Sequence, residues 1–392
     1  MFAQISVAPA DPILGLTEAF RQDPRADKIN LGVGVFQNEA GITPVMAAVK
    51  GAETRLLSQE QSKGYLPIEG HARYGEQVRG LLFGADHGYD AITVQAPGGT
   101  GALRLAGEFL QRQMGARRIW VSNPTWANHQ GIFSAAGFTL QEYTYFDAQT
   151  SQLNFPGLLA DLAQVAANDV VLLHGCCHNP SGVDPTAEQW QDIAEVLAKR
   201  GAMVLVDLAY QGLGSGLRDD VKALEILLRK IPNLLIANSF SKNFGLYSER
   251  VGALTVVTTE AASAAAVLSQ LKVLVRGLYS NPPSHGAAVV TTILEDAALR
   301  AQWEQELAAM RQRIQQLRQD FVAGLAAAGV QRDFSFITQQ LGMFSFSGLT
   351  PAQVARLQEE FGIYMVSSGR MNVAGMRQQN IPQLCRAIAA VL

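Results

Sequence analysis

Short apolar runs alternate with stretches of helical pattern through the middle of the chain. The runs lie at residues 117–124, 138–146, 169–174, 203–210, 233–239 and 251–259, and several are continuously apolar. Helical stretches such as TAEQWQDIAEVLAKR, residues 186–200, lie between them. Buried parallel strands form continuous apolar runs of this kind, and helices connect them. The pattern therefore predicts an α/β fold with a mostly parallel sheet flanked by helices.

A longer amphipathic segment follows at residues 297–328. Its apolar residues, from Leu299 and Trp303 to Phe321 and Leu325, recur every three or four positions, which is the spacing of one helical face. We interpret this segment as a connecting helix packed on a sheet; the alternative is a coiled-coil partner site. Strand and helix patterns are mixed after it, as expected of a smaller α+β domain.

We expect the chain to have five parts. We expect an extended N-terminal arm at residues 1–12, the N-terminal part of a small domain at 13–44, a large domain at 45–296, the connecting helix at 297–328, and the C-terminal part of the small domain at 329–392. A chain of 392 residues is long enough for two domains of this kind.

Composition narrows the classes of function. Apolar residues make up 48% of the chain and charged residues 17%, which is typical of a compact globular protein. The formal net charge of −3 gives no reason to expect nucleic acid or an anionic membrane surface as a partner. We find no uninterrupted apolar segment long enough to span a bilayer and no export signal at the N-terminus.

The three cysteines, Cys176, Cys177 and Cys385, have no metal-binding spacing, which favours a reducing compartment. We therefore expect a cytoplasmic protein without a metal site.

Polar side chains follow several of the predicted strands. Asn179 comes after the run at 169–174, Asp207 and Tyr210 lie at the end of the run at 203–210, and Lys242 follows the run at 233–239. In open parallel sheets, ligands bind outside the carboxyl ends of the strands, so these four groups are expected to converge on one crevice. Each also has an ordinary structural explanation: a turn residue, a helix cap, a packed phenol and a surface lysine, respectively.

A glycine-rich segment, PGGTGALRLAGEFL at residues 97–110, precedes an apolar periodic stretch and contains Thr100. A helix that begins here would offer free amide donors to a phosphate. The segment has neither the dinucleotide fingerprint nor a Walker A loop. A phosphate site, a carboxylate and a lysine together fit pyridoxal 5′-phosphate, and Arg250 could supply a guanidinium for its phosphate.

Seven motifs resemble those of the class I, fold type I pyridoxal-phosphate-dependent aminotransferases. In chain order they are PGGTGALR, SNPTW, HNPSG, DLAYQG, SFSKNFGLYSERVG, YSNPP and SGRMNVAG. The chain is most similar to the bacterial aspartate and aromatic aminotransferases, and the resemblance covers essentially all of it. It implies a large domain with a seven-stranded, mostly parallel sheet, a smaller α+β domain, and a homodimer with shared active sites.

The resemblance also implies roles for the residues that would hold the cofactor. Lys242 would bond covalently to the cofactor aldehyde and then move the α-proton, while Asp207, supported by His129, would pair with the pyridine nitrogen. Asn179 and Tyr210 would hydrogen-bond the phenolic oxygen. The remaining contacts would come from Trp126 on the ring face, from Gly99, Thr100, Ser239, Ser241 and Arg250 on the phosphate, and from Tyr65 on the phosphate of the neighbouring subunit.

Two arginines would recognise the substrate. Arg370 matches the residue that binds the α-carboxylate, and Arg276 matches the one that the other subunit contributes to the distal carboxylate. Gly34, Asn179 and Trp126 would complete the substrate site. The alternative for Arg276 is an ion pair at the rim.

The resemblance implies transfer of the amino group of L-aspartate to 2-oxoglutarate with ping-pong kinetics. Thr100 and Asn281 favour aspartate, whereas Phe36, Gln37 and Gly64 depart from the aspartate pattern. A dual-specificity aromatic aminotransferase is therefore the alternative, and a pyridoxal phosphate lyase is the alternative from another class of enzyme.

Overall fold

The computed structural model describes residues 2–7, 14–85 and 87–392 and divides the chain into two compact units. Unit 1 consists of Met1–Thr43 and Arg313–Leu392, and unit 2 of Pro44–Gln312. The helix α11 (Ala297–Ala327) contains the boundary at residues 312 and 313. The two units are described separately below.

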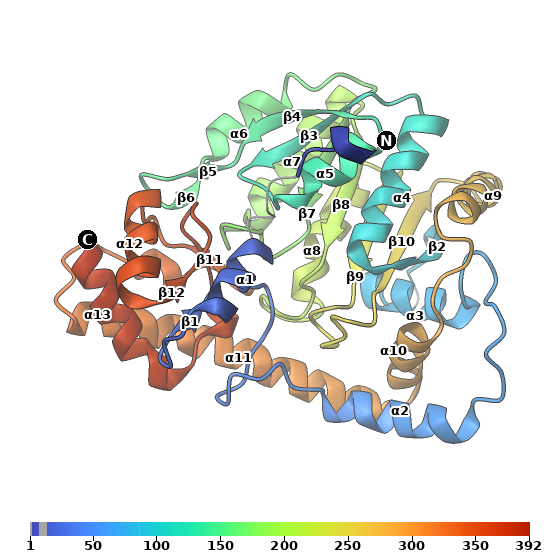
Figure 1. Ribbon diagram of the computed structural model, residues 1–392. Coiled ribbons are helices and arrows are strands. Elements are labelled where there is room, and N and C mark those ends of the chain that lie inside the picture. The colour runs from blue at the N-terminus through green and yellow to red at the C-terminus, as the bar shows by residue number, and fades with distance from the viewer. Residues whose placement is uncertain (1, 8–13, 86) are drawn as a thin grey trace. The chain divides into compact units, whose positions relative to one another are not determined.

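Unit 2 is built on a seven-stranded sheet with the order β2-β10-β9-β8-β7-β3-β4 (Figure 1). The strands are β2 (Asp90–Pro97), β3 (Arg118–Asn123), β4 (Thr139–Thr144), β7 (Val170–His174), β8 (Met203–Leu208), β9 (Leu234–Ser239) and β10 (Val251–Thr258). Only β10 runs antiparallel to its neighbours; the other adjacent pairs are parallel. The predicted α/β fold with a mostly parallel sheet is confirmed.

Six of these strands coincide with the predicted apolar runs, whereas the pattern of apolar residues did not predict β2. Its first residues, DAIT, are exposed or only partly buried, and continuous burial begins at Val94. β2 lies at the edge of the sheet and pairs with β10 alone. An edge strand needs less apolar sequence than a central one, which explains the weaker signal.

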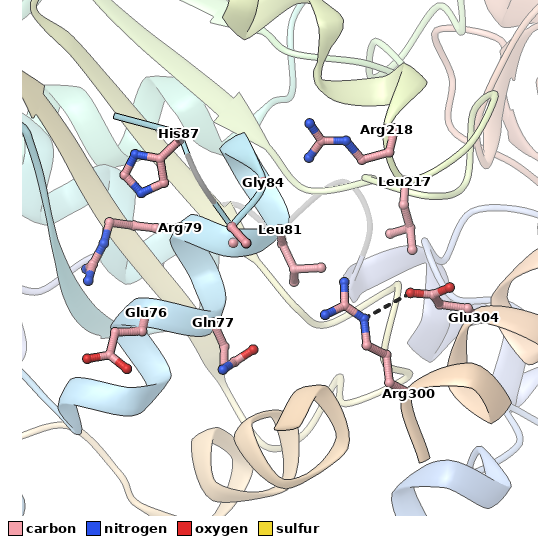
Figure 2. A pocket seen from close by; sticks show the side chains of 12 residues that line it. Glu76, Gln77, Arg79, Leu81, Gly84, His87, Leu217, Arg218, Arg300 and Glu304 are labelled. Atoms are coloured by element: carbon pink, nitrogen blue, oxygen red, sulfur yellow. Dashed lines mark hydrogen bonds and ion pairs between the residues drawn. The ribbon is translucent and has the colours of Figure 1, made fainter. Parts of the chain in front are cut away.

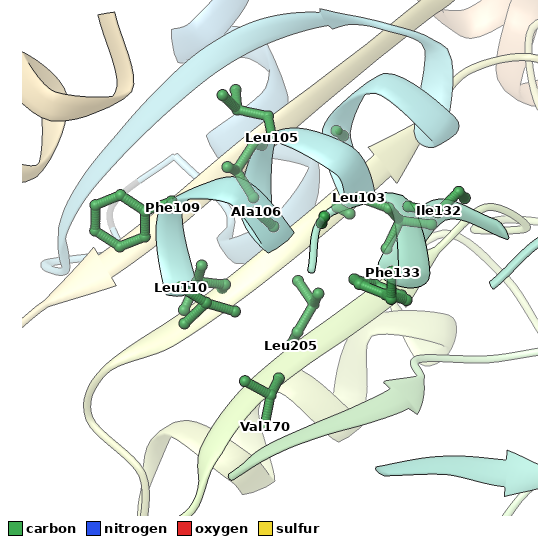
Figure 3. Packing of buried hydrophobic residues seen from close by; sticks show 14 of the residues in the cluster. Leu103, Leu105, Ala106, Phe109, Leu110, Ile132, Phe133, Val170 and Leu205 are labelled. Atoms are coloured by element: carbon green, nitrogen blue, oxygen red, sulfur yellow. The ribbon is translucent and has the colours of Figure 1, made fainter. Parts of the chain in front are cut away.

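Helices cover both faces of a sheet of this type, and α4 (Gly98–Gln113) contributes most to the core on its side. Figure 3 shows Leu103, Ala106 and Leu110 of α4 facing Val170 and Leu205 of the sheet. Each of these side chains is at most 1% exposed. Burying a side chain of leucine size contributes about 1.5–3 kcal/mol, so this layer holds α4 against the face of the sheet.

The other helices of this unit are α2 (Ala47–Gln59), α3 (Ala72–Phe83), α5 (Asn128–Ala135), α6 (Phe155–Leu162), α7 (Ala187–Arg200), α8 (Lys222–Leu228), α9 (Ala261–Leu278) and α10 (His285–Glu295). The predicted helix at 186–200 is α7, which begins with a capping box formed by Thr186 and Gln189. The predicted helix at 297–328 is α11, and its apolar face, including Trp303 and Phe321, is buried.

The helix α9 is long and apolar enough to cross a membrane by length and composition alone. Its 18 residues have a mean hydropathy of 1.3, and 22% of them are buried. The expectation concerned uninterrupted apolar segments, and α9 is interrupted by charged residues at Lys272 and Arg276. One face of α9 packs against α4, β2 and β10, and packed helices of this kind pass the same test, so a single one is weak evidence for a membrane span.

Unit 1 combines short strands and helices. Two two-stranded sheets pair β1 (Ile29–Asn30) with β12 (Ile363–Tyr364) and β11 (Phe344–Phe346) with β13 (Arg370–Asn372). Its helices are α1 (Leu14–Gln22), α12 (Pro351–Phe361) and α13 (Ile381–Val391), together with the end of α11. Of the predicted N-terminal arm, residues 2–4 form a 3-10 turn, and residues 1 and 8–12 lie outside the described part of the chain.

Candidate active site

The sheet register brings the ends of three segments to one edge. Because β10 is antiparallel, its first residue, Val251, pairs with Pro97 at the end of β2, and Gly252 pairs with Ser239 at the end of β9. Arg250 immediately precedes β10 and therefore lies at this same edge. The carboxyl ends of β2 and β9 and the start of β10 thus meet beside the N-terminus of α4.

The backbone at the start of α4 approaches its neighbours more closely than a side chain would allow. A Cβ added at Gly98 would lie 2.4 Å from Nη2 of Arg250, and one added at Gly99 would lie 3.0 Å from Cβ of Ser239. Gly98 also has a φ of +72°, which favours glycine. The first amides of α4 therefore lie beside a guanidinium and a serine without intervening side chains.

Hydroxyl groups line the same place. Ser239 Oγ donates to Ser241 Oγ at 3.2 Å, and Arg250 Nη1 donates to Ser241 Oγ at 3.4 Å. Thr100 lies in the first turn of α4. Helix amides, hydroxyls and a guanidinium are the groups that hold a phosphate, so we call Gly98, Gly99, Thr100, Ser239, Ser241 and Arg250 the anion cradle.

Asp207, in β8, accepts a hydrogen bond from a buried chain of side chains. His129 Nε2 donates to Asp207 Oδ2 at 3.1 Å. The other ring nitrogen of His129 lies 2.8 Å from Thr125 Oγ1, which lies 3.2 Å from His174 Nε2. With His174 donating to Thr125 and Thr125 donating to His129, every group in this series has a partner.

The surroundings of Asp207 in this hydrogen-bonded series keep its carboxylate ionised. Burial raises the pKa of Asp207, but the hydrogen bond from His129 and the nearby positive charges, including Lys242, bring it below its ordinary value. Burial lowers the pKa of His174 to about 3, so His174 is neutral. Asp207 is therefore an ionised carboxylate that can hold a protonated ring nitrogen.

Lys242 follows β9 and lies over a phenol. Its Nζ is 4.7 Å from the ring centroid of Tyr210. Burial lowers the pKa of Lys242 to about 8, Asp207 opposes this shift, and Arg250 adds to it. About a tenth of the amine is consequently neutral at pH 7, far more than for an ordinary lysine, and the neutral form is the one that a nucleophile or proton acceptor requires.

Asn179 and Tyr210 lie together at the ends of β7 and β8. Asn179 Nδ2 donates to the Tyr210 hydroxyl at 3.4 Å. Asn179 is 4% exposed, and its Oδ1 has no hydrogen-bond partner among the described residues. A buried amide oxygen of this kind is costly unless a ligand or water donates to it. Trp126 is half-buried and meets the edge of the His129 ring, with 5.2 Å between centroids.

Tyr65 and Arg276 belong to one exposed face of unit 2. Tyr65 is 95% exposed, and Arg276, in the last turn of α9, is exposed and donates to Ser280 Oγ. Asn281 Nδ2 donates to the carbonyl of Leu66 at 2.8 Å, which joins the two segments. The structure describes no ion pair at Arg276, so the alternative of a rim ion pair has no support in the described residues.

Within unit 1, Arg370 is buried beside the segment that carries Gly34. Arg370 is 5% exposed, donates from Nη2 to the carbonyl of Gly32 at 2.6 Å, and lies 4.5 Å from the Phe344 ring centroid. A Cβ at Gly34 would lie 2.9 Å from Cζ of the same ring. Gly34, Phe344 and Arg370 thus form one cluster.

Several supporting residues were missed in the sequence. His174 ends β7 and pairs in register with Asp207, so its place at a strand end was an available signal. Thr125 had no such signal. Gln211 donates from Nε2 to the carbonyls of Leu81 and Leu217, and its own carbonyl accepts from Asn243, the neighbour of Lys242.

Comparisons with known proteins agree with this geometry. The family model "Aminotransferase class I and II" matches residues 26–388. The chain is 54% identical to an aspartate aminotransferase of Haemophilus influenzae and 45% identical to an aromatic-amino-acid aminotransferase of Escherichia coli, with full coverage of all chains.

A solved structure is also similar: an aromatic-amino-acid aminotransferase from Burkholderia pseudomallei, covalently bound to pyridoxal phosphate, aligns with a TM-score of 0.98 and 47% identity. The alignment covers 100% of this chain and 99% of that one. The fold type I assignment is thereby confirmed. With a family match over nearly its whole length and a relative above half identity, this chain belongs to the class I and II aminotransferase family.

Proposed function

We propose that the chain uses pyridoxal 5′-phosphate to transfer the amino group of L-aspartate to 2-oxoglutarate. The observation that carries this proposal is the convergence of an ionised Asp207, a Lys242 of lowered pKa and the anion cradle at one edge of the sheet. The relative at 54% identity, named an aspartate aminotransferase, supports the choice of substrate.

The residues present fit the cofactor. The cradle offers glycine backbone, two serine hydroxyls and Arg250 to a phosphate, and a Cβ at Gly98 or Gly99 would obstruct it. The buried Oδ1 of Asn179 lacks a partner among the described groups, which is expected where a ligand completes the site. We assign the ring nitrogen to Asp207, the phenolic oxygen to Asn179 and Tyr210, and the ring face to Trp126.

The chemistry that follows depends on how the chain holds charge and protons. When bound, pyridoxal phosphate supplies an aldehyde for amines and a ring that withdraws electrons. Asp207, fixed by His129, keeps the ring nitrogen protonated through a charge-assisted hydrogen bond of about 1.5–3 kcal/mol. The neutral amine of Lys242 would accept the α-proton on Nζ and, in the same half-reaction, would deliver it to the cofactor carbon that carries the aldehyde. Two successive transfers at one site predict ping-pong kinetics.

Two arginines account for a dicarboxylate substrate. We assign the α-carboxylate to Arg370, next to Gly34, and the distal carboxylate to Arg276 of the other subunit. A guanidinium binds a carboxylate through two parallel hydrogen bonds, and burial strengthens the pair. Arg276 is exposed within one chain, which agrees with a role in a neighbouring site.

The exposed face supports a homodimer. Tyr65 is 95% exposed and Val273 of α9 is 67% exposed. Exposed apolar surface of this kind is typical of a protein interface. We therefore propose a homodimer in which Tyr65 reaches the cofactor phosphate of the partner and Arg276 its substrate.

Two further parts of the proposal concern location and domains. The buried thiols of Cys176, Cys177 and Cys385 suit a reducing compartment, so we propose a cytoplasmic location. We also propose that the chain is organised into the five parts expected from its sequence. These are an arm at 1–12, a small domain formed by 13–44 and 329–392, a large domain at 45–296, and a connecting helix at 297–328. Closure of the small domain over the substrate would then exclude water.

An aromatic-amino-acid aminotransferase is the second candidate function. Its support is the solved relative from Burkholderia pseudomallei, at 47% identity. A pyridoxal phosphate lyase has less support, because it has no use for a second carboxylate-binding arginine.

The decisive experiment compares kcat/KM for aspartate, glutamate, phenylalanine and tyrosine with 2-oxoglutarate, in the wild type and in Arg276→Ala. We expect aspartate to be preferred and to lose about 2–5 kcal/mol of transition-state stabilisation in the variant, with a much smaller loss for phenylalanine. Lys242→Ala serves as the inactive control. Equal losses on both substrates, or a preference for phenylalanine in the wild type, would refute the aspartate assignment; release of free ammonia would indicate a lyase.

A further inference from the structure

A cavity of about 770 Å³ lies in unit 2, and none of its described lining residues belongs to the candidate active site. Its walls come from the second half of α3, from Gly84, Ala85 and His87 after it, from residues 217–218, and from the beginning of α11 (Figure 2). Leu81 and Leu217 give it an apolar surface. A volume of this size accommodates a small metabolite.

Basic groups line the cavity on both sides. Figure 2 shows Arg79 and His87 on one side, and Arg218 and Arg300 on the other with Leu217 between them in this view. Arg218 is only weakly paired, with 3.6 Å between its Nη2 and Glu225 Oε1. A Cβ at Gly84 would lie 3.6 Å from Nη2 of Arg218, so this guanidinium extends along the glycine at the end of α3.

Among the basic residues of the lining, Arg79 would gain most from an anionic partner. It is partly buried, and no carboxylate of the described residues lies within ion-pair distance of it. Burial lowers the pKa of Arg79, with Glu76 opposing the shift, but a guanidinium keeps its charge at neutral pH. A partly desolvated charge without a counter-ion is destabilising, and a bound anion would relieve it.

His87 adds a hydrogen-bond donor next to Arg79. Its Nδ1 accepts from the backbone amide of Tyr89 at 3.0 Å, so the ring proton of the neutral imidazole lies on Nε2. Burial and the charge of Arg79 both lower the pKa of His87. The nearby guanidinium and the neutral imidazole together offer donors to an oxyanion.

The two carboxylates among the described lining residues, Glu76 and Glu304, do not cancel this arrangement. Glu304 is exposed and pairs with Arg300 one turn earlier on α11, at 3.1 Å. Glu76 is exposed on α3. An exposed pair at this spacing contributes only about 0.3–0.5 kcal/mol, so Arg300 can exchange Glu304 for a ligand at little cost.

We propose that this cavity binds a small molecule that carries two or more anionic groups. One group lies against Arg218 and Arg300, and the other against Arg79 and His87. The shared chemistry is that of a polyphosphate or a polycarboxylate. The proposal does not depend on the function proposed above, because the cavity shares no described lining residue with the candidate active site.

Calorimetric titration of the cofactor-loaded dimer tests the proposal, with inorganic triphosphate and citrate as separate probes at fixed ionic strength. We expect at least one probe to bind, and the double variant Arg79→Gln, Arg218→Gln to weaken that binding by about tenfold or more. The probe that binds more tightly identifies the class of anion. Arg229→Gln, which changes an exposed arginine outside the cavity, is the matched control and should bind as the wild type does.

A variant that is expected to strengthen anion binding provides the second test. Glu304→Gln removes a negative charge from the lining and releases Arg300, so it should tighten binding by about twofold to fivefold. Binding of neither probe, or equal binding by the wild type and the double variant, would overturn the proposal. If the double variant does not fold, unchanged or weaker binding by Glu304→Gln overturns it instead.

Discussion

The amine of Lys242 lies among groups with opposing effects on its charge. Burial and Arg250 favour the neutral form, while Asp207 favours the protonated form. The balance lowers the pKa to about 8 rather than suppressing the charge altogether. Asp207 can therefore stabilise a cation on the ring nitrogen without holding Lys242 permanently protonated.

This balance predicts the pH dependence of Lys242 reactivity in the protein without its cofactor. The neutral fraction of an amine grows as the pH rises through its pKa, so labelling by an amine-selective reagent should increase through about pH 8 and level off above it. Asp207→Asn removes the opposing charge and should shift the midpoint to lower pH. Peptide mass mapping as a function of pH measures both midpoints. A midpoint near about 10.4, the value of an unperturbed lysine, would contradict the prediction.

Among single residues, the sequence identified the reactive side chains at the strand ends but not the side chains that support them through hydrogen bonds. Asp207 and Lys242 were identified because each follows a continuous apolar run. Thr125 was not, because its role arises from the distances to His129 and His174, which lie 4 and 49 residues away. Contacts between distant segments leave no periodic signal in a single sequence.

Among the elements, α11 supports the segment that carries Lys242. Trp303 is fully buried, stacks on Phe244 with 4.3 Å between centroids, and donates from Nε1 to the carbonyl of Asn243 at 2.8 Å. The helix thereby contacts both of the residues that follow the lysine, Asn243 and Phe244. The pattern of apolar residues predicted that this face of α11 is buried, but not which segment it contacts.

Replacement of Trp303 measures this support. Trp303→Phe retains an aromatic ring but leaves the buried carbonyl of Asn243 without its donor, which costs about 1–3 kcal/mol of unfolding free energy. Denaturant titration provides the measurement. Trp190→Phe is the matched control, since Trp190 is 7% exposed and its indole makes no hydrogen bond to the described residues. A loss no greater than that of the control would mean that the hydrogen bond contributes nothing.

The strands show where periodicity succeeds and where it fails. Central strands such as β7 and β8 are buried on both faces and were recognised with errors of a residue or two. The edge strand β2 was missed because its first half is exposed. Its importance follows from its register with β10, which no apolar pattern reveals.

At the scale of the whole molecule, the exposed face formed by α9 and Tyr65 bears on whether a single chain can form a complete active site. Val273 and Tyr65 are 67% and 95% exposed, and Arg276 belongs to the same helix as Val273. The likeness of the motifs implied a shared site, and these exposures support it. If the proposed homodimer is correct, a single chain lacks the partner's Tyr65 and Arg276.

A charge on this face should therefore separate the subunits. Val273→Glu would place a carboxylate in the proposed dimer interface, so we expect sedimentation to show a monomer and activity with aspartate to fall sharply. Leu392→Glu, at the exposed C-terminal residue of unit 1, is the control and should leave the mass and activity unchanged. A fully active monomeric Val273→Glu variant would exclude the shared site.

The reversed direction of β10 has a practical consequence for protein engineering. Its beginning lies among the reactive groups, so its other end, followed by the exposed Thr259 and Glu260, must lie at the opposite margin of the sheet. A reporter domain or an immobilisation tag spliced into this turn would be separated from the chemistry by the full length of the strand. The turn thus offers an attachment point that leaves both chain termini in their native form.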